Sequence, residues 1–338
     1  MIKTSLPLVT DEPVVALRRL FLWLTSGCNS RCIMCDIWKE KLGTGLSLDQ
    51  IRAWAADWRG LGVPIVILCG EPLLHSDVWE MCQIIRDEGI AVELLSNGYL
   101  VPKHAASLLE HCEVWRASLD GPQEIHDVTR GVRNAFGMLR NGIATVRALD
   151  PSYEISGRCA IHRKNFRHLP ETVRAARDLG LSSISFSGTD LFNEEAFQRH
   201  DRIDGDYVEA LGIAGDDLGV LEDELARMRA ECGEEFASGY ISDTPEDLDR
   251  NVLRYYRALA GQVPFPDRPC NSPWTSAIVE YSGAVRPCFP LDAYGVVGRD
   301  GSLSDVLNSP AAVRMRAELD VKNDAACQRC VCQTAFYG

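Results

Sequence analysis

The sequence lacks the features of a membrane, secreted or nucleic-acid-binding protein. No apolar segment approaches the roughly 20 residues that span a bilayer. Acidic residues and proline interrupt the N-terminal stretch MIKTSLPLVTDEP, where a signal peptide would have an apolar core. The 35 Lys and Arg are outnumbered by 48 Asp and Glu, and the net charge of -13 disfavours broad contact with polyanions. We therefore expect a cytoplasmic protein with a compact substrate and with no nucleic-acid or membrane partner.

The sequence also has no repeat of fixed period and no low-complexity tract. Its main pattern is an alternation of β-rich runs with helical runs, which is typical of βα units around a parallel sheet. The expected strands are 20–27, 64–70, 91–98, 113–121, 153–161 and 182–188. The expected helices are 47–62, 77–89, 103–112, 134–150 and 168–180.

Six strands with five intervening helices predict an α/β fold in the form of a partial, open (β/α)6 TIM-like barrel. The predicted barrel occupies residues 1–188. Residues 189–263 are acidic and helical, carry no visible catalytic constellation, and are interpreted either as a cover over the barrel or as a plain surface insertion. After the Pro-rich stretch VPFPDRPC, residues 264–338 form a small module that bears cysteines.

Thirteen cysteines are present, and five of them are isolated, as buried apolar cysteines often are. A long chain without secretory features keeps its thiols reduced, so clustered cysteines favour metal binding over disulfides. The other eight form two sets. They are Cys28, Cys32 and Cys35 near the start, and Cys270, Cys288, Cys327, Cys330 and Cys332 near the end.

The first set, CNSRCIMC, follows the first expected strand. Structural zinc sites need four closed ligands, so three thiols would have to recruit a fourth, such as His75. An iron–sulfur cubane held by three thiolates instead leaves one iron open for a small molecule. Both interpretations stay open on the spacing alone.

The Cys28-x-x-x-Cys32-x-x-Cys35 motif resembles that of the radical S-adenosylmethionine (SAM) superfamily, although Met34 stands where the superfamily usually has an aromatic residue. The segment Cys69-Gly70-Glu71-Pro72 resembles the GGEP segment of that superfamily, with Cys69 in place of the first Gly. The resemblance implies that Gly70, Glu71 and Pro72 receive the SAM amino group. It also implies that Ser96, Asn97, Ser118 and Asp120, at the next two strand ends, contact the ribose or carboxylate of SAM.

The second set resembles the opening of the SPASM and twitch extensions of radical SAM enzymes, and the number of cysteines fits twitch better. By that resemblance Cys270, Cys288, Cys327 and Cys330 ligate an auxiliary four-iron, four-sulfur cluster. Cys332 is then left over, or exchanges roles with Cys330. The expected cofactors are SAM and two 4Fe-4S clusters, with a flavodoxin or ferredoxin as the reducing partner.

The resemblance implies reductive cleavage of SAM to a 5′-deoxyadenosyl radical, which abstracts hydrogen from a substrate. The main expectation is an oxidoreductase or epimerase acting on a carbinol carbon of a sugar-like or aminocyclitol natural-product unit. Cys332 is the first candidate for the hydrogen donor, with Cys69 and Cys159 as alternatives. Arg163, with Arg158, His162 and Lys164, is a candidate base or substrate anchor.

Two other functions remain open. The alternative reaction is modification of a ribosomally made peptide, although only about twenty residues precede the first expected strand, which is too few for a peptide-recognition domain there. An iron–sulfur electron carrier is the non-enzymatic alternative, and it leaves the SAM-like segments unexplained.

Overall fold

The computed structural model describes residues 12–193, 205–266 and 270–332. Within them a nine-stranded sheet has the order β6-β5-β4-β3-β2-β1-β7-β8-β9. The strands are β1 (Arg19–Trp23), β2 (Ile65–Cys69), β3 (Ala91–Ser96), β4 (Val114–Ser118), β5 (Glu154–Ile161), β6 (Ser183–Gly188), β7 (Ser276–Val279), β8 (Ala284–Arg286) and β9 (Gly295–Val296).

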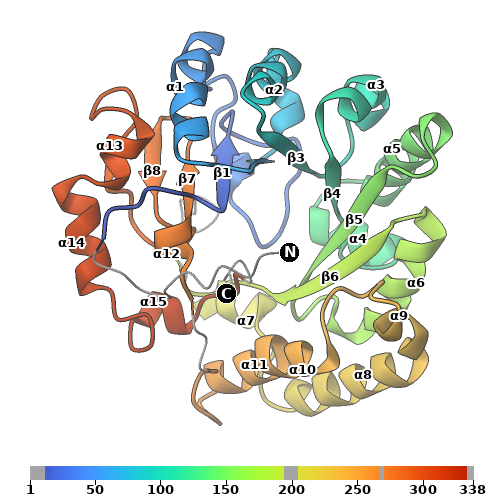
Figure 1. Cartoon of the computed structure of the whole chain (residues 1–338). Coiled ribbons are helices and arrows are strands. Elements are labelled where there is room, and N and C mark those ends of the chain that lie inside the picture. Colours follow the sequence, from blue (N-terminus) through green and yellow to red (C-terminus); the bar gives the residue numbers. More distant parts are fainter. Residues whose placement is uncertain (1–11, 194–204, 267–269, 333–338) are drawn as a thin grey trace.

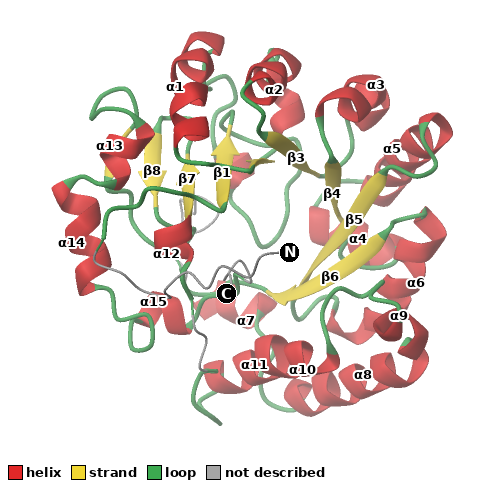
Figure 2. Ribbon diagram, in the orientation of Figure 1, coloured by secondary structure: helices red, strands yellow, loops and turns green. Residues whose placement is uncertain are grey.

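The six predicted strands are all present, and β1 to β6 pair in parallel with their neighbours. The sheet curves into an open barrel with helices on its outside (Figures 1 and 2). The helices of this part are α1 (Leu48–Gly60), α2 (Val78–Asp87), α3 (Val101–His111), α4 (Gln123–Arg130), α5 (Ala135–Leu149) and α6 (Leu169–Leu179), with 3-10 turns η1 (Ile37–Lys39), η2 (Pro72–Leu74) and η3 (Phe166–His168). The partial (β/α)6 barrel is therefore confirmed, with α4 as a helix that the periodicity did not predict.

Local sequence explains the outer helices well. The Ser47 hydroxyl accepts the backbone N–H of Gln50 at 3.2 Å, and the side-chain oxygen of Gln50 accepts the backbone N–H of Ser47 at 2.8 Å, which fixes the start of α1. The buried face of α1 consists of Ile51, Trp54, Ala55 and Trp58, at helical spacing. These side chains join the main core between the sheet and the helices.

The C-terminal module extends the same sheet. Strand β7 pairs in parallel with β1, and β8 and β9 continue as an antiparallel hairpin and edge. Its helices are α12 (Ser272–Thr275), α13 (Leu303–Leu307), α14 (Pro310–Glu318) and α15 (Ala325–Gln328). The Pro-rich boundary predicted at 263–270 falls partly on 267–269, outside the described residues.

The acidic helical segment lies along the edge of β6 (Figure 1). Its elements are α7 (Gly205–Leu211), α8 (Asp217–Glu231), α9 (Gly233–Ala237), α10 (Pro245–Leu248), the π-helical turn η5 (Asp249–Leu253) and α11 (Arg254–Leu259). Ile184 donates its N–H to the carbonyl of Tyr240 and accepts the N–H of Ser242, so this segment covers the backbone edge of β6. No described helix is long and apolar enough to cross a membrane.

Candidate functional site

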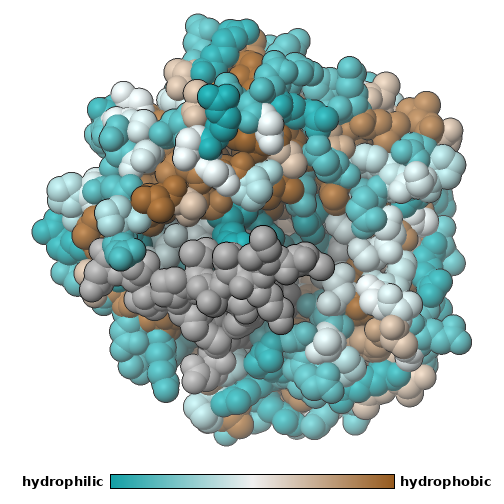
Figure 3. Space-filling view, viewed as in Figure 1, coloured by the Kyte–Doolittle hydropathy of each residue, from teal (hydrophilic) through white to brown (hydrophobic). Residues whose placement is uncertain are grey.

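A cavity of about 240 Å³ opens at the carboxyl ends of the parallel strands. This is the end of a parallel barrel where catalytic residues gather. Of the residues predicted for the site, the cavity is lined by Cys28, Cys32, Cys35, Gly70, Glu71, Ser96, Asn97, Ser118, Asp120, Cys330 and Cys332. Figure 3 shows hydrophobic side chains beneath α1 and α2, around the middle of this face.

The three thiols of the first set lie half-buried on the loop after β1. The N–H of Ser30 points at the sulfur of Cys28 at 3.4 Å, and the Ser30 hydroxyl lies 3.3 Å from the sulfur of Cys32. Burial raises the pKa of the Cys28 thiol, and Glu71 and the other two thiols add to the shift. A bound cation is what converts such thiols to thiolates.

These thiols fit an iron–sulfur cluster better than a single metal ion. Among the described residues, no three His, Cys, Asp or Glu side chains are close enough to share one ion. In a cubane each thiolate binds a different iron, so wider spacing suits it, and hydrogen bonds to sulfur are typical of such sites. Both ring nitrogens of His75 are engaged, with the carbonyl of Leu46 at 2.8 Å and the N–H of Asp77 at 3.1 Å. His75 is therefore not the fourth ligand that the zinc interpretation needs.

Glu71 is almost completely buried beside these thiols. Its two carboxylate oxygens accept the Ser96 hydroxyl at 2.8 Å and the Asn97 N–H at 3.0 Å, which ties the ends of β2 and β3 together. Gly70 precedes it with φ +81°, a conformation that glycine adopts without strain. Burial raises the pKa of Glu71 to about 7, although both hydrogen bonds oppose the shift. A carboxylate has about four acceptor positions, so Glu71 retains capacity for a further donor.

Several residues predicted to touch SAM have other partners here. The Ser96 hydroxyl donates a hydrogen bond to Glu71. The side-chain amide of Asn97 donates to the side-chain oxygen of Asn29 at 2.7 Å and points at the sulfur of Cys28 at 3.8 Å. Both residues therefore support the loop of the first set as well as lining the cavity. Pro72 is buried at the start of η2 and is not among the lining residues.

Asp120 forms a buried ion pair that the sequence did not predict. Its carboxylate lies 2.5 Å from the guanidinium of Arg130, and it also accepts the N–H of Ala160 at 3.2 Å. Burial alone would lower the pKa of Arg130, but the attraction of Asp120 outweighs it and the pKa is raised. Another nitrogen of Arg130 lies 3.5 Å from the sulfur of Cys32. The pair therefore holds a guanidinium N–H donor beside the sulfur of Cys32.

The five thiols of the second set are half-buried and interact electrostatically. Burial raises the pKa of Cys288, and Cys327, Cys332 and Cys270 raise it further. The N–H of Cys332 points at the sulfur of Cys330 at 3.2 Å. Of the five, Cys330 and Cys332 line the cavity that also holds the first set.

Arg163 does not line the cavity, although its place just after β5 favoured a catalytic role. Its guanidinium lies 3.2 Å from Asp217 at the start of α8 and donates to the carbonyl of Glu209 at 2.9 Å. It therefore joins the end of β5 to the helical segment. His162 is buried with a pKa lowered to about 3 by burial and is also absent from the lining. Arg158, in contrast, lines the cavity.

Residues 24–176 match the Radical SAM superfamily, and residues 270–331 match the SPASM iron–sulfur cluster-binding domain. The protein therefore combines a radical SAM domain with a C-terminal auxiliary-cluster module, as the cysteine spacing predicts. A radical SAM domain binds SAM and a 4Fe-4S cluster, and a SPASM domain binds auxiliary iron–sulfur clusters. The predicted cofactors are confirmed at that level.

Curated relatives match either about half of the chain or most of it. An AdoMet-dependent heme synthase of Methanosarcina barkeri is 32% identical over 169 residues, which cover 48% of each chain. The chain thus spans about half the length of the curated relatives that it matches first. The antilisterial bacteriocin subtilosin biosynthesis protein AlbA of Bacillus subtilis is 24% identical over 301 residues, or 85% of this chain and 58% of AlbA.

Solved structures share the fold over most of the chain. SuiB of Streptococcus suis, bound to its precursor peptide SuiA, superposes with a TM-score of 0.62 at 12% identity and covers 94% of this chain and 71% of SuiB. The structure of anSMEcpe with AdoMet and the Cp18Cys peptide gives a TM-score of 0.62 at 17% identity. The match covers 92% of this chain and 88% of anSMEcpe. At these identities the likeness concerns the fold alone.

Proposed function

We propose that the protein is a radical SAM maturase that modifies a peptide. The observation that carries the proposal is the similarity to AlbA, which runs through the barrel, the helical segment and the C-terminal module. The heme synthases match only about half of the chain and bear mainly on SAM chemistry. This proposal replaces the sugar-like substrate as the leading hypothesis.

In this proposal Cys28, Cys32 and Cys35 hold the cluster that binds SAM, and Cys270, Cys288, Cys327 and Cys330 hold the auxiliary cluster. When bound, the first cluster supplies the electron that cleaves SAM to methionine and the 5′-deoxyadenosyl radical, which takes hydrogen from the substrate. Glu71 accepts the SAM ammonium, and the apolar side chains of Phe21, Trp23 and Ile37 exclude water from one wall of the cavity.

Cys332 is the proposed hydrogen donor because it lines the same cavity as Glu71 and Ser118, two of the residues expected to contact SAM. Its S–H bond breaks and a C–H bond forms at the substrate radical, which inverts the carbon if the hydrogen arrives on the opposite face. One electron from a flavodoxin- or ferredoxin-type reductant and one proton restore the thiol. The auxiliary cluster that Cys270, Cys288, Cys327 and Cys330 would hold would supply an electron acceptor for the alternative outcome, oxidation of the substrate, which would also need a base for the proton.

The sugar-like or aminocyclitol substrate remains a second candidate. The observation in its favour is the polar wall of the cavity, to which Ser118, Ser187, Thr189 and Asp190 contribute hydroxyl and carboxylate groups. Such groups suit a polyhydroxylated unit as well as they suit a peptide backbone.

The reaction can be tested in deuterium oxide with the reconstituted, reduced enzyme. The probes are a random nonapeptide library and, in parallel, 2-deoxystreptamine as an aminocyclitol. We expect 5′-deoxyadenosine and modified peptides, with a gain of one deuterium for epimerisation or a loss of two hydrogens for oxidation, read by mass spectrometry. Modification of the aminocyclitol alone would contradict the peptide proposal.

The same assay tests the proposed donor. Cys332→Ala should still form 5′-deoxyadenosine, while deuterium incorporation should fall at least about a hundredfold, because the quenching S–D bond is gone. Cys232→Ala, which removes a buried thiol outside the cavity lining, is the matched control. Undiminished incorporation in Cys332→Ala would assign the donor elsewhere.

The raised pKa of Glu71 predicts a pH dependence of SAM binding. Because the pKa of Glu71 is about 7, the carboxyl is increasingly neutral below pH 7, whereas the α-ammonium of SAM stays charged there. We expect the dissociation constant of SAM to rise by up to about tenfold per unit as the pH falls from 7 to 5.5. Calorimetry on the oxidised, cluster-loaded protein measures it, and Glu71→Gln should bind weakly with no such slope. A flat profile in the unsubstituted protein would contradict the role of Glu71.

A further inference from the structure

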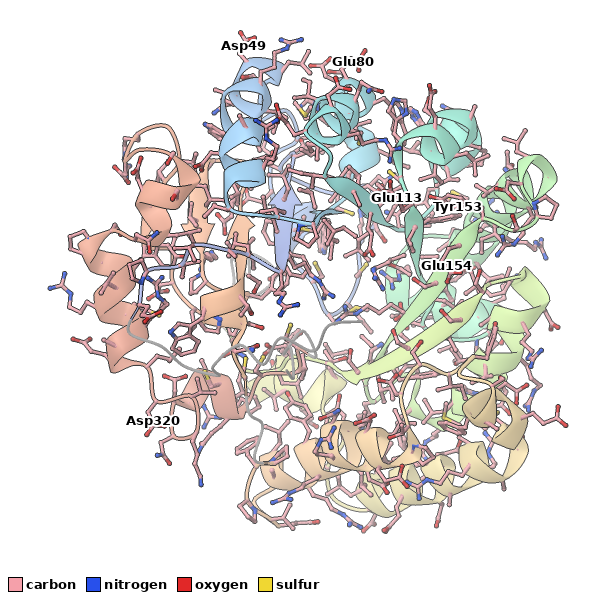
Figure 4. The ribbon with its side chains drawn as sticks, viewed as in Figure 1. Asp49, Glu80, Glu113, Tyr153, Glu154 and Asp320 are labelled. Atoms are coloured by element: carbon pink, nitrogen blue, oxygen red, sulfur yellow. The ribbon has the colours of Figure 1, made fainter. Side chains whose placement is uncertain are left out.

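Three arginines share the inner face of the barrel: Arg19 on β1, Arg116 on β4 and Arg158 on β5. Successive side chains in a strand point to opposite faces. Phe21, Ser118 and Ala160 line the cavity, and each stands two positions after one of these arginines. We call Arg19, Arg116 and Arg158 the arginine cluster. Figure 4 shows that acids such as Asp49, Glu80 and Asp320 project instead from the outer rim.

The members of the cluster are close enough to influence one another. Burial lowers the pKa of Arg19. The positive charges of Arg116 and Arg158 lower the same pKa further, whereas Glu93 and Cys332 oppose the shift. Among these groups, Glu93 is paired with Arg116, whose Nε donates to it at 2.6 Å. Three guanidinium groups therefore lie on one face of the barrel in a protein whose net charge is -13.

Arg158 is the member that is open to a ligand. It is exposed, it lines the cavity, and within the described part of the chain its guanidinium donates no hydrogen bond and forms no ion pair. Asp243 senses its charge, but the carboxylate of Asp243 accepts the N–H of Phe186 at 2.7 Å, and burial raises its pKa to about 6. No ion pair joins Asp243 to Arg158 in the described part of the chain, so the guanidinium of Arg158 is left with free donors.

The acids of the cavity wall are also engaged. Asp120 is paired with Arg130, and Glu71 holds Ser96 and Asn97. Asp190 accepts the N–H groups of Phe192 and Asn193 in its own turn. Among the described residues Arg158 is thus a cation of the cavity wall that forms no ion pair, and its guanidinium presents paired donors that match a carboxylate.

We infer that the arginine cluster, through Arg158, binds a carboxylate of the substrate, so that the enzyme selects peptides with an acidic group near the residue that it modifies. The inference rests on the proposed peptide function. Arg158 and Cys332 line the same cavity, so an anchored carboxylate would hold the neighbouring residue of the peptide near the proposed donor thiol.

The test uses three nonapeptide libraries on immobilised, reconstituted enzyme with SAM. In the first library the C-terminus is amidated and a fixed Glu stands between random flanks that contain no Asp or Glu. The second library is the same but has Gln at the fixed position. The third library has the same Gln but a free C-terminal carboxylate. We expect the Glu library to be retained about tenfold more than the amidated Gln library, as a charge-assisted hydrogen bond implies. Retention of the free-acid library shows whether a terminal carboxylate also serves.

Arg158→Gln should abolish the preference for a carboxylate, and Arg140→Gln, which alters an exposed arginine on the outer helix α5, should keep it. Equal retention of Glu and Gln peptides by the unsubstituted enzyme overturns the inference and leaves the peptide function intact. A preference that survives Arg158→Gln, or an equal loss of SAM affinity in that variant, also overturns it. No retention of any library overturns both the inference and the peptide function.

Discussion

Substituting Asp120 by Asn should lower the free energy of unfolding by about 3–5 kcal/mol, because it leaves the buried guanidinium of Arg130 without its counter-ion. The amide can still accept the N–H of Ala160, so the loss reports mainly on the ion pair. Denaturant unfolding of the cluster-free protein, followed by circular dichroism, measures the change.

A second variant separates the charge from the packing. Adding Arg130→Met to Asp120→Asn removes both charges and should recover a large part of the lost stability, since a buried pair replaced by apolar groups is often nearly neutral. A loss below about 1 kcal/mol in Asp120→Asn, or no recovery in the double variant, would contradict a buried, mutually dependent pair.

Changing Cys28, Cys32 and Cys35 together to Ala should remove about half of the iron and abolish formation of 5′-deoxyadenosine, with a loss of more than about a thousandfold. The expected loss is this large because cofactors of this kind perform the difficult step and the protein has no substitute for it. Iron analysis after anaerobic reconstitution and chromatography of the nucleoside products measure both effects.

The matched control is the triple change of Cys270, Cys288 and Cys327 to Ala. It should remove the other half of the iron yet retain cleavage of SAM, because these three thiols lie outside the cavity lining. If the first triple variant kept its full iron content, Cys28, Cys32 and Cys35 would not be cluster ligands.

The sequence predicts the six barrel strands because all are short β-rich runs between helical patterns. Strands β1 and β2 are apolar and almost wholly buried, whereas β5 alternates buried residues with more exposed ones. The sequence does not predict α4, since QEIHDVTR is short and its two buried residues, His126 and Thr129, are polar. That helix ends at Arg130, so the partner of Asp120 was missed together with the helix. The end of this helix has a sequence signal: a basic residue, Arg130, is followed by Gly131, which adopts φ +61° as a helix-ending glycine does.

Arg163 illustrates the opposite error. Position after a strand end predicts proximity to the site, but β5 runs to Ile161, and the chain then turns so that Arg163 meets Asp217 of α8. That contact joins segments far apart in sequence, and no local pattern indicates it. Arg158, which lies within β5, is the residue of the same stretch that lines the cavity.

The pairing of β7 with β1 restricts how the C-terminal module can be removed from the barrel or replaced by another module. Strand β1 has β2 on one side and β7 on the other, and its register with β7 runs from Arg19 opposite Ser276 to Leu22 opposite Val279. A shortened chain that ends before residue 270 would leave β1 as an open, apolar edge, which favours aggregation. A module from another enzyme can replace this one only if it brings a strand that pairs with β1, so a chimaera has to carry that strand together with its cysteines.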